Sequence, residues 1–137
     1  MATNLSFQFY NHELHSYYYR QLLASRSIDA AGLGSFLPPT GYIVFYGDVP
    51  AAIGFMIKCD NGMAINSDLI SNPDVPQPMC ADAVDFVRQL LAEEAEASGL
   101  RFITAFTKHK KLAERLIGKG FAKIDENLIQ VGRFLWL

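Results

Sequence analysis

The side chains best suited to catalysis or metal binding in this sequence are two cysteines and three histidines. Cys59 and Cys80 do not show the spacing of a zinc-binding pair, and His12, His15 and His109 are scattered, so we expect no metal site. Cys80 has no base beside it in the sequence, which favours a buried, reduced thiol over a nucleophile. Any catalytic group would have to be assembled from residues far apart in the chain.

A run of basic residues near the C-terminus offers another kind of chemistry. Lys108, Lys111, Arg115 and Lys119 follow one another at near-helical spacing. Such a stripe is typical of a solvated helix face, and it can also meet an acidic partner or phosphate groups. Both interpretations stay open at the level of sequence.

Length and composition limit the class of protein that can carry these residues. The chain has 137 residues, of which 50% are apolar, 12% aromatic and 19% charged, with a formal net charge of −2. This length predicts one domain, residues 1–137, with its own core, and the apolar content excludes disorder. The near-neutral charge argues against a nucleic-acid-binding protein.

Partners and compartment are predicted from the same composition. Average domains carry about 25% charged residues, so this chain has a comparatively apolar surface. Together with the apolar segment Val131–Leu137, this favours a homodimer. Met1–Tyr10 lacks a basic leader, and the longest apolar run, Pro50–Ile57, is too short to cross a bilayer. We therefore expect a cytoplasmic protein without membrane contacts.

Apolar and turn-forming residues divide the first half of the chain into a strand, a helix and three further strands. The strand Leu5–Tyr10 precedes a helix that Asn11 caps and that runs to Ser25. Ser27–Gly41 is rich in glycine and proline, which predicts a connection that can supply a substrate-facing loop. An antiparallel meander follows, formed by Tyr42–Tyr46, Ala51–Cys59 and Met63–Ser71.

The second half alternates helices and strands. The prolines of Asn72–Pro78 predict an irregular loop, so the next helix is expected to begin near Met79–Asp82 and to end at Gly99. The strand Arg101–Thr107 must lie parallel to Met63–Ser71, because such crossovers are right-handed. The remaining expected elements are the helix His109–Ile117 and the strands Phe121–Ile124 and Leu128–Leu137.

This order of elements resembles the GNAT superfamily of N-acyltransferases over Ala51–Ile124. The local patterns that carry the resemblance are Ile53-Gly54-Phe55, Leu69–Asp74, Glu93–Gly99, Phe102–Phe106 and Gly120-Phe121. The resemblance implies an α/β fold of the α+β type, in which a mixed antiparallel and parallel central sheet has helices on both faces. It also implies transfer of an acetyl group from acetyl-CoA to an amine of a small molecule or a protein.

In that family, the loop after the long strand carries the signature Gln/Arg-x-x-Gly-x-Gly/Ala, whose amides hold the pyrophosphate of the coenzyme. The signature falls on Pro76–Ala81, where only Ala81 is an accepted residue. Pro78 removes an N–H donor, Met79 replaces a glycine, and Asp82 would repel a phosphate. The implied coenzyme-binding residues are Leu69, Ile70, Ser71, Met79, Cys80, Ala81, Asp82 and Lys108.

The catalytic positions of the family are altered as well. A tyrosine often used as general acid falls on Leu116, which cannot donate a proton. A frequent asparagine falls on His109, which either is solvated or transfers protons near neutral pH. Asp68 is the candidate general base, although the usual glutamate position falls nearer Ile65. The rings of Tyr17–Tyr19 can line an acceptor pocket or pack against the sheet.

Three functions remain open at this point. The first is an N-acyltransferase in which an amine attacks acetyl-CoA directly. The second is a GNAT-fold binding or assembly module that has lost catalysis, and the third is a sensor that binds a coenzyme or nucleotide without turnover. The fold pattern favours the first, whereas the altered loop and Leu116 favour the second.

Overall fold

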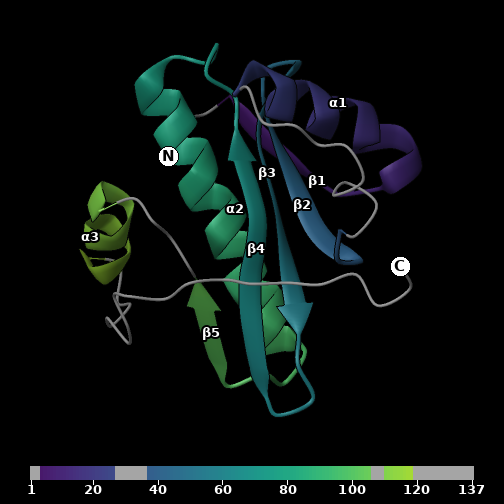
Figure 1. Cartoon of the computed structure of the whole chain (residues 1–137), viewed down its shortest axis with the longest axis vertical. Helices are drawn as coiled ribbons and strands as arrows, with labels where there is room; N and C mark the ends of the chain where they lie inside the picture. The colour runs from purple at the N-terminus through teal and green to yellow at the C-terminus, as the bar shows by residue number, and fades with distance from the viewer. Residues whose placement is uncertain (1–3, 27–36, 106–109, 119–137) are drawn as a thin grey trace, which may run out of the picture. The chain divides into compact units, whose positions relative to one another are not determined.

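A computed structural model describes residues 4–26, 37–105 and 110–118 (Figure 1). In the described residues, no helix has the length and hydropathy needed to span a bilayer.

The chain divides into two units, Met1–Phe106 and Thr107–Leu137. The expected strands Phe121–Ile124 and Leu128–Leu137 lie outside the described residues. The elements are β1 (Leu5–Phe9), α1 (His12–Ser25), β2 (Thr40–Tyr46), β3 (Val49–Lys58), β4 (Met63–Ser71), α2 (Gln77–Ala97), β5 (Phe102–Ala105) and, in the second unit, α3 (Lys110–Gly118).

The strands of the first unit form one sheet in the order β1-β2-β3-β4-β5. β1 pairs antiparallel with β2, β2 with β3, and β3 with β4. β4 and β5 run parallel and are connected through α2. The expected meander and the parallel crossover are therefore confirmed. Because a parallel pair cannot be joined by a hairpin, the long amphipathic segment between β4 and β5 had to cross the sheet as a helix.

Alternate residues of β3 pack on opposite faces of the sheet. Ile53 and Phe55 belong to a cluster with residues of α1, and we call this side the α1 face. Met56 belongs to a cluster with Val87 and Leu91 of α2, on the side that we call the α2 face. Figure 1 shows α1 and α2 on opposite sides of the strands. The expected mixed sheet with helices on both faces is thus confirmed.

α1 begins at a cap that also ties it to β1. Oδ1 of Asn11 accepts hydrogen bonds from the backbone N–H groups of Glu13 and Leu14 at 3.0 and 3.3 Å. The N–H of Asn11 donates to Nδ1 of His15 at 2.9 Å, and Nε2 of His15 lies 3.1 Å from Oε1 of Gln8. Because Nδ1 accepts a hydrogen bond, the imidazole is neutral. Burial lowers the pKa of His15, in agreement with this state.

α2 begins at Gln77, slightly before the segment Met79–Asp82 near which its start was predicted. Pro76 is the N-cap residue, and Pro78 lies in the first turn. A proline is tolerated there, because the missing N–H would have no helical acceptor and the fixed φ suits a helix. The expected end is confirmed, since α2 stops at Ala97 and is followed by Gly99 with φ 78°.

Candidate active site

β4 extends beyond the strand with which it pairs at the edge of the sheet. The parallel ladder joins Met63–Asn66 to Phe102–Ala105, and its last described pair is Asn66 and Ala105. β4 continues to Ser71, so Ser67–Ser71 has no β5 partner among the described residues. We call this segment the free edge of β4. Among the described residues, no strand pairs with its backbone groups on the side away from β3, and such groups can pair with another extended chain.

A β-bulge lies at the start of the free edge. The register of β3 and β4 shifts between Ile53 and Phe55, so that Asp68 and Leu69 both lie opposite Gly54. Asp68 has φ 55°, a left-handed value that Asp and Asn adopt more readily than most other residues. A bulge of this kind bends the strand and redirects its side chains, and bulges are frequent next to active sites.

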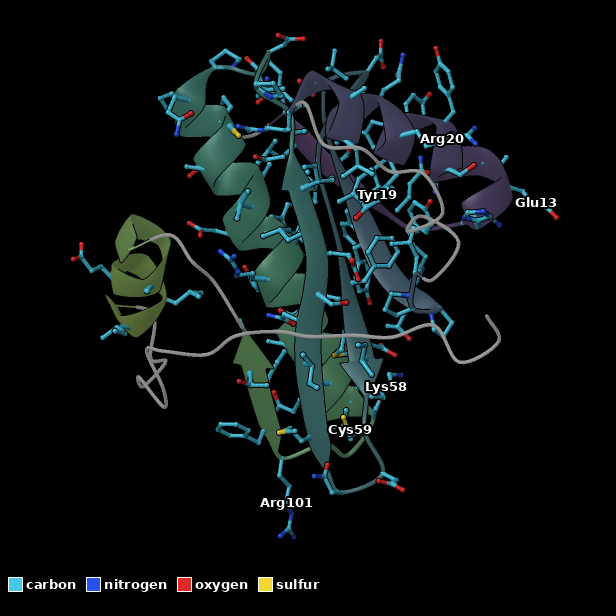
Figure 2. The ribbon with its side chains drawn as sticks, in the orientation of Figure 1. Glu13, Tyr19, Arg20, Lys58, Cys59 and Arg101 are labelled. Carbon is cyan, nitrogen blue, oxygen red and sulfur yellow. The ribbon has the colours of Figure 1, made fainter. Side chains whose placement is uncertain are left out.

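Contacts on both faces of the sheet hold the bulge. On the α1 face, the hydroxyl of Tyr19 donates to the carbonyl oxygen of Asp68 at 2.9 Å, and Figure 2 shows Tyr19 on the side of α1 that faces the strands. On the α2 face, a Cβ atom added to Gly54 would lie 2.7 Å from Cγ1 of Val87 and 2.9 Å from Cδ1 of Leu69. Only glycine therefore allows this close packing of α2 on the bulge.

Backbone groups of Leu69 and Ser71 point away from β3, toward the free edge. The N–H of Asn72 donates to the carbonyl of Ala51 on β3 at 2.8 Å, which sets the alternation of the antiparallel ladder. Two residues earlier, Ile70 therefore directs its N–H and C=O toward β3. The carbonyl of Leu69 and the N–H of Ser71 then face the opposite edge. An extended chain that contains amides could pair with this acceptor and donor.

Arg26 lies at the far end of the free edge. It is the C-cap residue of α1, it is exposed, and its Nε donates to the carbonyl of Ser71 at 3.0 Å. Its Nη2 also donates to Oγ of Ser71 at 2.7 Å. A guanidinium carries five N–H donors, so Arg26 keeps donors that these two bonds do not use. An anionic group at this end of the strand would meet a positive charge in a fixed position.

The segment between β4 and α2 offers few backbone donors. Pro73, Pro76 and Pro78 have no N–H. Within residues 72–80, the amides of Gln77 and Met79 donate to no acceptor among the described residues. The donors already used within the chain are the amides of Asn72, Asp74, Val75 and Cys80.

Three polar side chains near the bulge have buried atoms without a hydrogen-bond partner in the described structure. These atoms are both amide atoms of Asn66 and the hydroxyls of Ser67 and Tyr10. Ser67 lies on the α1 face because it pairs with Phe55, against which the Tyr10 ring packs at a centroid distance of 4.7 Å. Asn66 lies on the α2 face because it pairs with Met56. Buried polar groups without partners are rare, and they indicate places where a ligand or water completes the hydrogen bonds.

Burial sets the protonation of the tyrosines beside the bulge. It is the main cause that raises the pKa of Tyr19, and the charges of Asp68 and Tyr10 raise it further. Burial also raises the pKa of Tyr10, against an opposing effect of Arg20. Both phenols therefore stay protonated at neutral pH, so Tyr19 donates to the carbonyl of Asp68 and the hydroxyl of Tyr10 keeps a proton that a ligand could accept. Asp68, by contrast, is exposed at the bulge itself.

The structure separates the site residues expected from the sequence into groups. At the bulge and on the free edge lie Asp68, Leu69 and Ser71. Inside the core or within α2 lie Ile70, Met79, Cys80, Ala81 and Asp82, and the amide of Cys80 donates to the carbonyl of Pro76. Leu116 is buried. Lys108 and His109 lie outside the described residues. The roles of these residues stay predictions.

Sequence analysis did not find Arg26, Asn66, Ser67 or Tyr10. Arg26 meets a residue 45 positions away in the chain, and no local pattern announces such a contact. Asn66 and Ser67 did leave a signal, because consecutive polar residues interrupt an otherwise apolar strand. Their importance depends on burial, which strand alternation alone did not reveal.

Comparison of sequences finds no relative: no protein-family model and no curated protein matches the chain. Solved structures are similar to it in fold. A glucosamine-6-phosphate N-acetyltransferase from Arabidopsis thaliana has a TM-score of 0.67 and 8% identity, over 96% of this chain and 98% of that chain. An aminoglycoside acetyltransferase from an uncultured soil metagenomic sample has a TM-score of 0.66 and 10% identity, over 96% and 97%.

A third similar structure is the ribosomal-protein-S18-alanine N-acetyltransferase from Escherichia coli. It has a TM-score of 0.64 and 12% identity, over 84% of this chain and 75% of that chain. At such identities the likeness establishes the fold and not the activity. The chain therefore has the fold of GNAT acetyltransferases, as its order of elements predicted.

Proposed function

We propose that this chain, which has the GNAT fold, is an N-acetyltransferase that moves an acetyl group from acetyl-CoA to an amine. The observation that carries the proposal is the bulge of β4 at the point where its ladder with β5 ends. An extended substrate can pair with the free edge there, while its reacting end reaches the bulge. The three similar enzymes described above are all named for amine-bearing acceptors, which supports an amine as the acceptor class.

The free edge suits the amide-containing pantetheine arm of the donor. The carbonyl of Leu69 can accept from an amide N–H, and the N–H of Ser71 can donate to an amide carbonyl, as neighbouring strands do. The thioester at the end of the arm would then lie beside Asp68. This arrangement uses only backbone groups whose direction the pairing with β3 has fixed.

The phosphate end of the donor is proposed to meet Arg26 and the start of α2. Arg26 is held by Ser71 and supplies a planar cation with unused N–H donors. The amides of Gln77 and Met79 lie in the first turn of a helix of 21 residues, whose N-terminus carries partial positive charge. Lys108, expected from the sequence to add charge, stays part of this proposal.

The proposed reaction transfers the acetyl group directly. Asp68 takes one proton from the substrate ammonium, directly or through water, and leaves a neutral amine. The amine nitrogen forms a bond to the thioester carbonyl carbon, the carbon–sulfur bond breaks, and sulfur leaves with the bonding electrons. The nitrogen loses its second proton, which ends on the sulfur, so the products are an amide and free CoA thiol. Leu116 cannot transfer that proton, and His109 is the proposed residue for it.

A binding module without turnover is the second candidate. The loop before α2 favours it, because prolines and the hydrogen bonds between described residues leave two amides of residues 72–80 for a phosphate. Leu116 also favours the binding module, because it stands where the family often has a proton donor. The two candidates differ in whether a bound donor is consumed.

We also propose that the protein forms a homodimer and acts in the cytoplasm. Phe7 and Phe9 are 46% and 66% exposed on β1, an edge strand of the described sheet. Exposed aromatic residues on an unpaired edge favour association with a second copy. Sedimentation at tens of micromolar is the measurement, and a monomer at that concentration would contradict the dimer.

Calorimetric titration with acetyl-CoA, combined with acetyl-transfer assays on a panel of amines, tests both candidates. Arg26→Ala is expected to weaken acetyl-CoA binding about tenfold, the worth of one charge-assisted contact. Asp68→Asn should lower kcat and leave donor binding unchanged. The control is Arg101→Ala, which removes an exposed arginine at the opposite end of the sheet (Figure 2).

The outcomes separate the candidates clearly. Transfer to an amine that depends on Asp68 supports the enzyme. Binding without transfer to any amine supports a module that holds the donor without turnover. The absence of binding at millimolar acetyl-CoA would overturn the enzyme and would support a GNAT-fold binding or assembly module with weak or no CoA binding.

A further inference from the structure

Asn66 is a partly buried polar residue for which direct acetyl transfer has no use. Nδ2 and Oδ1 of its side chain are both buried, and neither has a hydrogen-bond partner in the part of the chain that the structure describes. The residue forms the last pair of the β4–β5 ladder, opposite Ala105, directly before the free edge. A buried polar group without a partner lowers the stability of the folded state, so two such atoms on one side chain need an explanation.

The surroundings of Asn66 on the α2 face are apolar. Its partner in the ladder is Met56, which is 1% exposed, and Ala64, two residues earlier on β4, is fully buried. Hydrogen bonds formed among such neighbours are stronger than in water, because the local dielectric constant is low. The next residue, Ser67, lies on the α1 face, so the side chains of Asn66 and Ser67 lie on opposite faces of the sheet.

We propose, on the basis of the acyltransferase function, that Asn66 sets the preference of the site among acyl donors, and that a donor whose acyl group carries a hydroxyl or a carboxamide is used in preference to acetyl-CoA. The donor arm pairs with Leu69 and Ser71, and its thioester lies at Asp68. The acyl group continues along β4 in the direction of Asn66. The side chain of Asn66 therefore lies closer to the acyl group than to the rest of the donor.

Hydrogen-bond complementarity identifies the chemical class of that acyl group. The amide of Asn66 presents donors at Nδ2 and an acceptor at Oδ1, so its ligand must both accept and donate. A hydroxyl or a carboxamide does both. A carboxylate only accepts, would leave Oδ1 without a donor, and would bring a charge into apolar surroundings. An alkyl chain would satisfy neither atom, and the carbonyl of acetyl could accept from Nδ2 but could not donate to Oδ1.

Competition between acyl donors tests the proposal. We expect kcat/KM with 3-hydroxybutyryl-CoA to exceed that with butyryl-CoA at least about tenfold, and succinyl-CoA to be a poor donor. Asn66→Leu should abolish or reverse the preference for the hydroxyl-bearing donor. Ser67→Ala, on the opposite face, is the matched control and should leave the ratio between the two donors unchanged. A thermal melt of each variant shows whether it remains folded.

Binding measurements keep this proposal separate from the proposed function. The dissociation constants of 3-hydroxybutyryl-CoA and butyryl-CoA are measured by calorimetry in the absence of an amine. A preference for the hydroxyl-bearing donor that Asn66→Leu removes supports the selection even where no transfer occurs, which would contradict only the enzyme. Equal affinities and equal rates for the two donors would overturn it. A uniform loss for every donor in Asn66→Leu, acetyl-CoA included, would also overturn it, since that pattern assigns Asn66 to the pantetheine arm.

Discussion

The free edge of β4 and the start of α2, the two halves of the proposed donor site, are built in different ways. At the free edge, the donor and acceptor are backbone groups of Leu69 and Ser71, whose direction follows from strand pairing. At the start of α2, binding depends on which residues carry an available N–H, and Pro76 and Pro78 carry none. A site formed by strand pairing tolerates changes of side chain, whereas one formed by loop amides is lost residue by residue.

α1 contributes to both halves through side chains. Tyr19 holds the carbonyl of Asp68 at the bulge, and Arg26 holds Ser71 at the other end of the free edge. The cation that the altered loop lacks is thus supplied from another element. Because one helix carries both contacts, changes that loosen α1 should affect the bulge and the phosphate end together.

The largest expected effect is on the bulge, through Gly54→Ala. The added Cβ would come within 3 Å of Val87 and Leu69, and overpacking of this kind typically costs about 1–3 kcal/mol. Urea unfolding measures the loss. Gly118→Ala is the control, because no atom lies within 4 Å of the added Cβ, and it should show no loss. A Gly54→Ala protein as stable as the parent would show that α2 does not clamp the bulge.

Pro78→Ala tests whether the start of α2 binds the phosphate end of the donor. The substitution restores an N–H in the first turn of α2, where helical bonding does not use it. We expect acetyl-CoA to bind about 5–10-fold more tightly, the worth of one hydrogen bond to a charged group. S-acetyl-pantetheine, which has no nucleotide, should bind as before. Equal gains for both ligands in calorimetry would contradict the assignment of phosphates to this turn.

A smaller effect is expected from Tyr19→Phe. The variant removes the hydroxyl that donates to the carbonyl of Asp68 at 2.9 Å, and the net loss should be about 0.5–1.5 kcal/mol. Tyr17→Phe, on an exposed side of the same helix, is the matched control and should change stability little. Denaturant unfolding gives the stabilities, and the acetyl-transfer rate shows whether the bulge keeps its geometry. Identical stabilities for the two variants would show that the hydroxyl of Tyr19 does not stabilise the bulge.

The smallest expected effect is a dependence of stability on pH through His15. Burial lowers its pKa in the folded protein below the ordinary value of 6.5, so the unfolded chain binds the proton more readily. The stability from neutral His15 is therefore complete above about pH 6.5 and is lost as the pH falls below it. Melting temperatures should fall more steeply there for the parent than for His15→Gln. His12→Gln, exposed on α1, should follow the parent, and parallel curves for all three proteins would refute this coupling.

The sequence alone predicts the order of the described elements and the mixed sheet. The signals were local: Asn11 at the helix cap, Gly99 after α2, and the alternation of Ile53, Gly54 and Phe55 between the two faces. Short-range propensity and periodicity suffice for such features, because neighbours in the chain decide them. The start of α2 lies slightly before the predicted segment because a proline opposes a helix in its interior but not in its first turn.

Only the tertiary structure decided how the candidate site is assembled. The contact of Arg26 with Ser71 joins residues 45 positions apart, and that of Tyr19 with Asp68 joins residues 49 apart. Whether Asn66 is paired or orphaned depends on what surrounds it after folding, and the direction of each backbone group on the free edge depends on the register with β3. These properties arise from packing between distant segments, and a sequence pattern carries no direct record of them.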